Sequence, residues 1–203
     1  MIMNQTLGNY GQQSGERCEY LTLAFSPLSA PIRSRWRNNG LSADFLGDYV
    51  ITFLPANGSM ATTESRQDEI RHAVTYIANE LLENAMKYHE PGVNIPIRIH
   101  LELTGDQITV SASNGIGAGQ AQRYQAFAAH VLAEDAGDML IRQLEESAAG
   151  EESNQSGLGL LTMINDYGAQ LGWRFEAHPA CVETMTVTTS AVLPLNIPPG
   201  VSA

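Results

Sequence analysis

The sequence lacks several features that mark particular classes of protein. It has two cysteines in 203 residues, Cys18 and Cys181, too few for a disulfide-stabilised scaffold. We expect reduced thiols in a cytoplasmic protein, although the sequence also permits a single bridge between them. No apolar run is long enough to span a membrane, and no basic segment followed by an apolar one begins the chain. We therefore expect neither membrane association nor a secretory signal.

Positive charge is scarce as well. Eleven Lys and Arg residues stand against 22 Asp and Glu, which gives a net charge of −11. Affinity for a nucleic-acid backbone depends on clustered Lys and Arg, so we expect no nucleic-acid partner. Three of the basic residues lie together in Arg33-Ser34-Arg35-Trp36-Arg37. This segment is either a docking patch for an acidic partner or simply the charged face of a short helix.

The length and the hydrophobic content of 43% suit one folded domain. We expect a flexible N-terminal segment at 1–16, a single domain at 17–195 and a C-terminal tail at 196–203. Antiparallel strand pairs separated by helices predict an α/β sandwich, in which helices cover one face of a mixed sheet. The predicted strands are 19–25, 95–103, 107–113, 173–177 and 182–193. The predicted helices are one or two within 32–54, a long one at 64–89 capped by Thr63 or Ser65, 118–133, 138–148 after a break at Gly137, and 158–167 ending at Gly168.

The long helix carries two stripes of side chains. Apolar residues recur with the 3.6-residue period of one buried face, at Ile70, Val74, Ile77, Leu81, Ala85 and Tyr88. Glu80, Asn84 and Lys87 form a second stripe about a quarter turn away. Such a stripe fits the wall of a pocket, but it also fits an ordinary solvated face. His72 and His89 flank these residues, and we expect both to be surface histidines.

Two glycine-containing motifs stand next to predicted elements. Ser113-Asn114-Gly115-Ile116-Gly117 follows a strand, and Gly157-Leu158-Gly159-Leu160 precedes a helix. Glycine beside a helix start lets the backbone approach a phosphate, which the free N–H groups and the helix dipole then bind. Either motif alone is also typical of an ordinary turn. The informative feature is their order after the E-x-x-x-N helix, with a strand pair between that helix and the first motif.

That order resembles the GHKL superfamily of Bergerat-fold ATP-binding proteins over residues 64–193. Residues 80–88 match its N box, 113–117 its first glycine box and 157–160 its second glycine box. The chain is most similar to the small serine/threonine kinases of the anti-sigma-factor type, and especially to SiaB-like protein kinases. Its size, the absence of a phosphoacceptor-histidine hairpin and the glutamate in the N box indicate this subgroup.

The resemblance implies ATP and Mg²⁺ as cofactors, with Asn84 as the metal ligand and Lys87 near the phosphates. Glu80 would be the general base for transfer of the γ-phosphate to a serine or threonine. The partner would be a small regulatory protein of the STAS or SiaC type, and a homodimer is compatible with the sequence. Residues 118–156 would form the lid, with a hinge through 150–157. The implied nucleotide contacts are Asn84, Lys87, Ser113, Asn114, Gly115, Gly117, Gly157, Leu158, Gly159 and Thr184.

Two positions depart from the superfamily pattern. The aspartate that holds the adenine amino group is replaced by Ser113, whose neutral hydroxyl would weaken adenine discrimination by about 1–2 kcal/mol. A Gly-Thr pair on the last strand reads Glu183-Thr184. Two hypotheses therefore stand: a Mg-ATP-dependent protein kinase, and a nucleotide-poor, catalytically silent module that acts by binding its partner. Retention of the glutamate, asparagine and glycines of the boxes favours the kinase, and a detached histidine-kinase catalytic domain is a third, weaker alternative.

Overall fold

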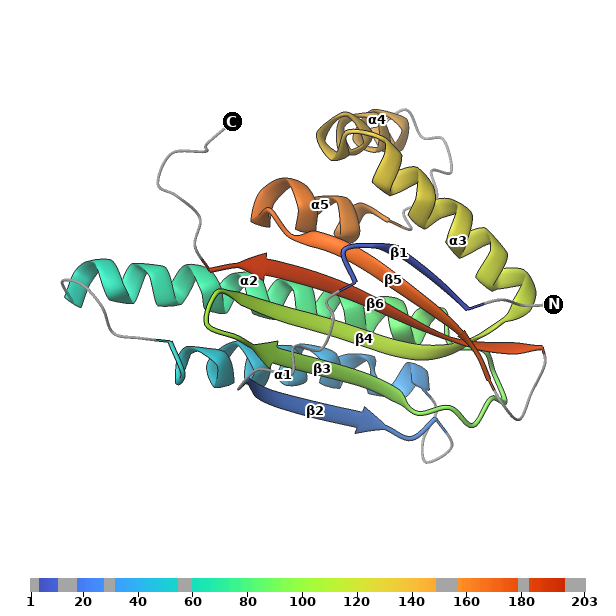
Figure 1. Ribbon diagram of the computed structural model, residues 1–203, viewed down its shortest axis with the longest axis horizontal. Coiled ribbons are helices and arrows are strands. Elements are labelled where there is room, and N and C mark those ends of the chain that lie inside the picture. Colours follow the sequence, from blue (N-terminus) through green and yellow to red (C-terminus); the bar gives the residue numbers. More distant parts are fainter. Residues whose placement is uncertain are drawn as a thin grey trace.

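The computed structural model describes residues 4–10, 18–27, 32–54, 60–148, 157–178 and 183–195, with the backbone alone for 32–38, 60–63 and 146–148. A six-stranded antiparallel sheet forms the centre, and helices pack against it (Figure 1). The sheet order is β1-β5-β6-β4-β3-β2. The strands are β1 (Gln5–Gly8), β2 (Glu19–Phe25), β3 (Ile97–Leu103), β4 (Gln107–Gly117), β5 (Gln170–Ala177) and β6 (Thr184–Pro194). The helices are α1 (Ile32–Ile51), α2 (Met60–Lys87), α3 (Ala118–Ala133), α4 (Ala136–Ala148) and α5 (Leu158–Tyr167).

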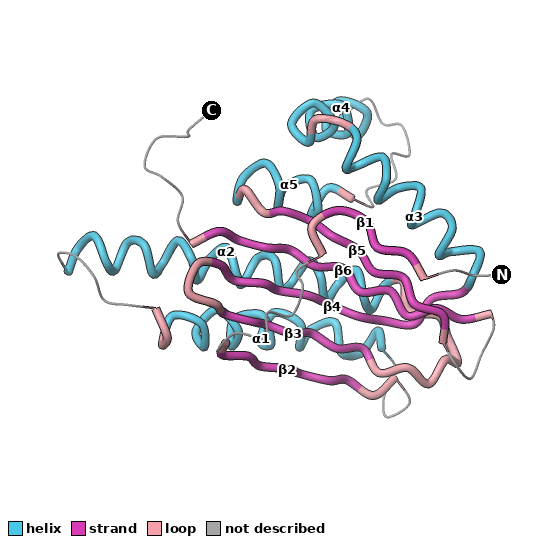
Figure 2. The backbone as a smooth tube through the Cα atoms, in the orientation of Figure 1, coloured by secondary structure: helices cyan, strands magenta, loops and turns pink. Residues whose placement is uncertain are grey.

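The predicted sandwich of a sheet and covering helices is confirmed, and β2, α3 and α5 have the predicted bounds. The sheet differs from the expected mixed sheet because all of its described pairings are antiparallel. The hairpin of β3 and β4 meets the pair of β5 and β6 through β4 and β6, which are neighbours in the sheet (Figure 2). These two strands also run in opposite directions. The two longest strands, β4 and β6, therefore lie side by side at the centre of the sheet.

One strand lies where the sequence indicated a flexible segment. Residues 5–8 form β1, which pairs along the edge of β5 from Gln5 opposite Phe175 to Gly8 opposite Gly172. Backbone pairing holds this strand, and the Oδ1 atom of Asn4 accepts a 3.0 Å hydrogen bond from the backbone of Ala177. Four mostly exposed residues show no alternation of polar and apolar side chains. The pattern that identifies half-buried strands is therefore absent from the sequence.

Helix α2 packs mainly on β4 and also on β3, and α1 runs along α2 (Figure 1). The predicted apolar face of α2 is confirmed, since Val74, Ile77 and Leu81 are buried in the core. The helix begins at Met60, so the expected caps Thr63 and Ser65 lie inside it. Helix α1 is one continuous element of 20 residues that also contains the basic segment 33–37. No helix in the described part of the chain is long and apolar enough to cross a membrane.

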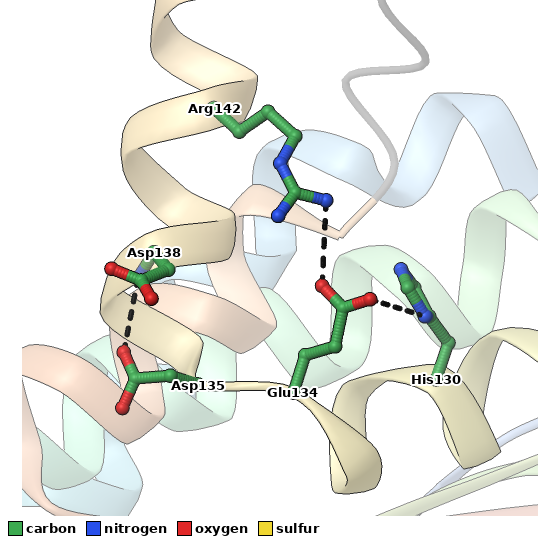
Figure 3. A network of polar contacts seen from close by, with 5 residues as sticks. All are labelled: His130, Glu134, Asp135, Asp138 and Arg142. Atoms are coloured by element: carbon green, nitrogen blue, oxygen red, sulfur yellow. Dashed lines mark hydrogen bonds and ion pairs between the residues drawn. The ribbon is translucent and has the colours of Figure 1, made fainter.

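The break between α3 and α4 lies at Glu134 and Asp135, not at Gly137. Glu134 adopts an extended conformation that ends α3, and the Oδ1 atom of Asp135 accepts a 3.0 Å hydrogen bond from the backbone of Asp138. This is the geometry of an N-cap, so α4 begins at residue 136 and contains Gly137 in its first turn. The Glu134 carboxylate also pairs with His130 and with Arg142, each at 3.4 Å, which joins the two helices (Figure 3).

The two faces of the sheet differ in polarity. Along β4, Ile108, Val110 and Ala112 are buried toward the helices, whereas Ser111 and Ser113 lie on the opposite, partly exposed face. The helix-covered face is therefore the face on which a buried site can form.

The two cysteines are not joined in the part of the chain that the structure describes. Cys18, the residue before β2, carries a free, half-buried thiol. Cys181 lies outside the described residues.

Candidate functional site

A small cavity lies between α2 and the sheet, with room for about one water molecule. Asn84 of the N box and Asn114 of the first glycine box both line it. Side chains from α2, α3, β4 and β6 line it. The lining residues are Leu81, Asn84, Ala85, Tyr88, Ala112, Asn114, Tyr124, Val187 and Thr189.

The first glycine box is not a turn after a strand. It continues β4 as far as Gly117, so the side chains of residues 113–117 alternate between the two faces of the sheet. Asn114 consequently points into the cavity beside Ala112. Ser113 lies on the other face, opposite Arg98 of β3 and Thr188 of β6. The structure therefore does not bring Ser113 to the cavity.

The amide of Asn114 is nearly inaccessible, with 4% of the residue exposed, and its Nδ2 atom has no hydrogen-bond partner. A buried polar group without a partner destabilises a fold by about 1–3 kcal/mol. Such groups are uncommon in folded proteins and require a reason. Asn84 lies half-buried on the facing helix and lines the same space. Two amide side chains therefore face one cavity.

Aromatic side chains form another wall of the cavity. The rings of Tyr88 and Tyr124 stack with 6.5 Å between centroids, and Tyr124 also stacks on Phe127 at 6.1 Å. The Tyr124 hydroxyl accepts a 3.0 Å hydrogen bond from Trp173 Nε1 and shares a 2.9 Å bond with Thr189 Oγ1. Burial raises the pKa of Tyr124.

Tyr124 and Thr189 line the cavity, although the sequence alone indicated neither as a site residue. The cross-strand pairing of Ala112 with Thr189 is what places this threonine at the cavity. That pairing joins residues of β4 and β6 that are far apart in the sequence. No local motif in the sequence marks such a contact.

The N box also meets the second glycine box. Glu80 is half-buried on α2, and Gly159 is the second residue of α5. A Cβ atom on Gly159 would overlap the Glu80 carboxylate, so the α5 backbone lies directly on this side chain. Burial raises the pKa of the Glu80 carboxyl, and the nearby charge of Glu83 raises it further. Glu80 is one helical turn from Asn84, so the metal ligand and the base proposed from the sequence are neighbours.

The other glycine of this box is fixed by its conformation and by space. Gly157 has φ of 128° at the start of α5, a region that L side chains rarely adopt. An added Cβ would lie 2.7 Å from Cζ of Phe127 on α3. Leu158 follows as the first, half-buried residue of α5. The second glycine box thus packs against both α2 and α3.

Four other predicted contacts do not reach the cavity. Lys87 is exposed, with its Nζ atom 5.2 Å from the centre of the Tyr88 ring. Gly115 and Gly117 instead allow residues 90–95 to pack closely on β4. Thr184 is buried opposite Gly117 and does not line the cavity.

His89 was expected on the surface, but only 6% of it is exposed. Its Nε2 atom donates to the carbonyl of Val93 at 3.2 Å, and its Nδ1 atom accepts from the backbone of Gly115 at 3.4 Å. This pair of contacts requires the neutral tautomer with the proton on Nε2. Burial lowers the pKa of His89 accordingly. The histidine therefore connects the end of α2 to the first glycine box.

The described residues hold no group of three His, Cys, Asp or Glu side chains that could bind a metal ion by themselves. Mg²⁺ usually keeps several waters and takes few ligands from the protein, together with substrate phosphates. Asn84, which presents an amide oxygen beside the cavity, fits this mode of binding.

The fold resembles a solved structure. No protein-family model and no curated protein matches the chain. A chain of the crystal structure of the SiaB–SiaC complex from Pseudomonas aeruginosa matches with a TM-score of 0.57 and 17% sequence identity. The match covers 85% of this protein and 89% of that chain. At this identity the likeness shows a shared fold.

Proposed function

We propose that this protein is an ATP-dependent regulatory kinase that transfers the γ-phosphate to a serine or threonine of a small partner protein. The observation that carries the proposal is the meeting of the three boxes. Glu80 lies against Gly159, and Asn84, one turn further along α2, shares a cavity with Asn114. Residues far apart in the sequence thus lie close together, and the proposal gives them the roles of base, metal ligand and phosphate-binding helix start.

Each group has a distinct role in this proposal. Asn84 would hold Mg²⁺, which neutralises phosphate charge when it is bound. Glu80 would accept the proton of the attacking hydroxyl. Its raised pKa favours this role, because a base is most effective when its pKa approaches the working pH. The first turn of α5 has backbone N–H groups without intrahelical acceptors, which suit a phosphate oxygen.

The proposed partner is a small protein of the STAS or SiaC type. The support is the fold shared with a chain from the SiaB–SiaC complex, together with the order of the boxes in the sequence. No extensive basic surface is needed for such a partner. The net charge of −11 is consistent with protein recognition rather than nucleic-acid binding.

One observation favours a second candidate, a silent module that binds its partner without using nucleotide. The Tyr124 ring faces the cavity, which has room for about one water molecule and therefore none for a purine in this conformation. Nucleotide binding at this cavity therefore requires part of its lining to move. A protein in which the cavity stayed closed would act through its surface alone.

Transfer of γ-labelled phosphate from ATP to a SiaC-type or STAS-type protein tests the proposal. We expect labelling that requires Mg²⁺ and is lost in Glu80→Gln, with Glu83→Gln as the matched control on the same helix. If the wild-type protein binds both Mg-ATP and the partner but leaves the partner unlabelled, the silent-module proposal replaces the kinase.

A further inference from the structure

The amide of Asn114 has no hydrogen-bond partner for its Nδ2 atom, although it lies in the core beside the proposed nucleotide site. We propose that Asn114, and not Ser113, contacts the nucleobase, and that this contact accepts adenine and guanine with little discrimination. The inference rests on the proposed function, because it assumes that a purine nucleotide binds here. It concerns which base the site prefers and which residue sets that preference.

The structure selects Asn114 through the register of β4. The strand continues without interruption through residue 114, so neighbouring side chains must lie on opposite faces. Ala112 and Asn114 face α2 and line the cavity. Ser113 lies between them and faces Arg98 and Thr188 across the open face of the sheet. A base held against α2 can therefore meet Asn114 but not Ser113.

Two other polar groups at the cavity, the hydroxyls of Tyr124 and Thr189, already have partners. The hydroxyls of Tyr124 and Thr189 bond to one another, and Trp173 Nε1 donates to Tyr124. The Nδ2 atom of Asn114 therefore remains a donor available to a ligand. Because a buried donor without a partner costs free energy, a ligand that supplies an acceptor recovers it on binding.

The chemistry of a carboxamide then sets the selectivity. It presents one acceptor oxygen and one donor nitrogen, the pattern that pairs with N7 and the amino group of adenine. Guanine presents the complementary pair O6 and N1–H, and a rotated amide satisfies both. A carboxylate offers only acceptors, so it favours the adenine amino group and repels O6 of guanine. An asparagine in this place therefore reads a purine but distinguishes the two purines poorly.

Titration of the full chain with Mg-ATP and with Mg-GTP tests the inference. We expect wild-type affinities for the two nucleotides to lie within about tenfold. Asn114→Asp should raise the preference for ATP over GTP by about tenfold or more, and Asn114→Ala should weaken both by about tenfold, as the loss of a hydrogen bond to a buried ligand predicts. Ser113→Asp, on the other face of the sheet, should leave the ratio unchanged. Circular dichroism confirms that each variant is folded, and Asn114→Ala suffices if the buried aspartate destabilises the protein.

The possible results separate the two proposals. Binding of both nucleotides, with a ratio that follows residue 114, supports the inference. If the wild type binds ATP but the ratio follows residue 113, or if Asn114→Ala binds as tightly as the wild type, the base is read elsewhere and only this inference is overturned. If the wild type binds neither nucleotide at millimolar concentration, both proposals are overturned.

Discussion

The carboxylate of Glu80 on α2 lies directly against the backbone of Gly159 on α5, so closely that any side chain at 159 would overlap it. This contact joins two motifs that are separated in the sequence by two strands and two helices. It also removes water from one side of the carboxylate, which raises its pKa. The absence of a side chain at residue 159 is therefore what lets the α5 backbone approach the Glu80 carboxylate.

Replacement of this glycine should disturb both partners. Gly159→Ala should lower stability only slightly, because the added methyl group meets the end of a flexible side chain that can rotate away. It should also displace Glu80 and reduce phosphate transfer. The matched control is Gly119→Ala, at the second residue of α3, where an added Cβ meets nothing within 4 Å. Phosphate transfer that is equally normal in the two variants would contradict the contact.

Glu80→Gln should lower the rate of phosphate transfer and, at neutral pH, raise the stability of the fold. Phosphate transfer should fall by about 10²-fold or more, the usual contribution of a general base, while ATP affinity changes little. Because the folded pKa of Glu80 is raised, its contribution to stability is present below the unfolded pKa and is lost as pH rises through the folded pKa. The variant should therefore melt above the wild type at pH 7.5, and the difference should shrink towards pH 4.

The control for this prediction is Glu83→Gln. Glu83 is half-buried on the same helix, accepts a 3.1 Å hydrogen bond from Asn79 and does not line the cavity. We expect near-normal transfer in this variant. Retained transfer in Glu80→Gln, measured with labelled ATP and the partner, would show that Glu80 is not the base.

Because His89 is buried in its neutral form, we expect the protein to lose stability in mild acid. Its folded pKa is lowered, so the neutral form stabilises the fold above the unfolded pKa, and this contribution is lost as pH falls through the folded pKa. The difference in melting temperature between pH 7.5 and pH 5 should be smaller in His89→Gln than in the wild type. His72→Gln, an exposed histidine on α2, should behave as the wild type. Identical pH dependence in the two variants would rule out this role.

Tyr124→Phe should destabilise the fold by about 1–3 kcal/mol, because Trp173 Nε1 and Thr189 both lose a partner in a buried place. Tyr49→Phe, in a half-buried ring on α1, is the matched control and should be close to neutral. Chemical denaturation monitored by tryptophan fluorescence reports both, since Trp173 is in contact with the changed group. A neutral Tyr124→Phe would show that water replaces the hydroxyl at no cost.

The sequence was sufficient for most of the fold because the elements have clear periodicity. The apolar face of α2 and the alternation in β3 and β4 are both visible in the residues themselves. β1 was missed because its four residues are held by backbone pairing at the edge of β5, which leaves no pattern in the side chains. The break before α4 was misplaced because Asp135 caps that helix, which lets Gly137 lie inside it.

The site was predicted only in part, for a different physical reason. Glu80, Asn84 and Gly159 lie on helices whose faces the sequence defines. Glu80 lies against Gly159 and is one helical turn from Asn84. Ser113 does not line the cavity, because β4 continues through the glycine box and places it on the opposite face of the sheet from Asn114. Tyr124 and Thr189 reach the cavity through long-range packing, which no local motif records.

The most direct test of the central claim is calorimetric titration of the purified protein with ATP, with and without Mg²⁺, in the wild type and in Asn84→Ala. We predict that the wild type binds ATP in a Mg²⁺-dependent way and that Asn84→Ala loses this Mg²⁺-dependent binding while its fold remains intact. Asn79→Ala, which changes an asparagine of the same helix that does not line the cavity, should bind as the wild type does. Absence of binding at millimolar ATP, or Mg²⁺-dependent binding that survives in Asn84→Ala, would contradict it.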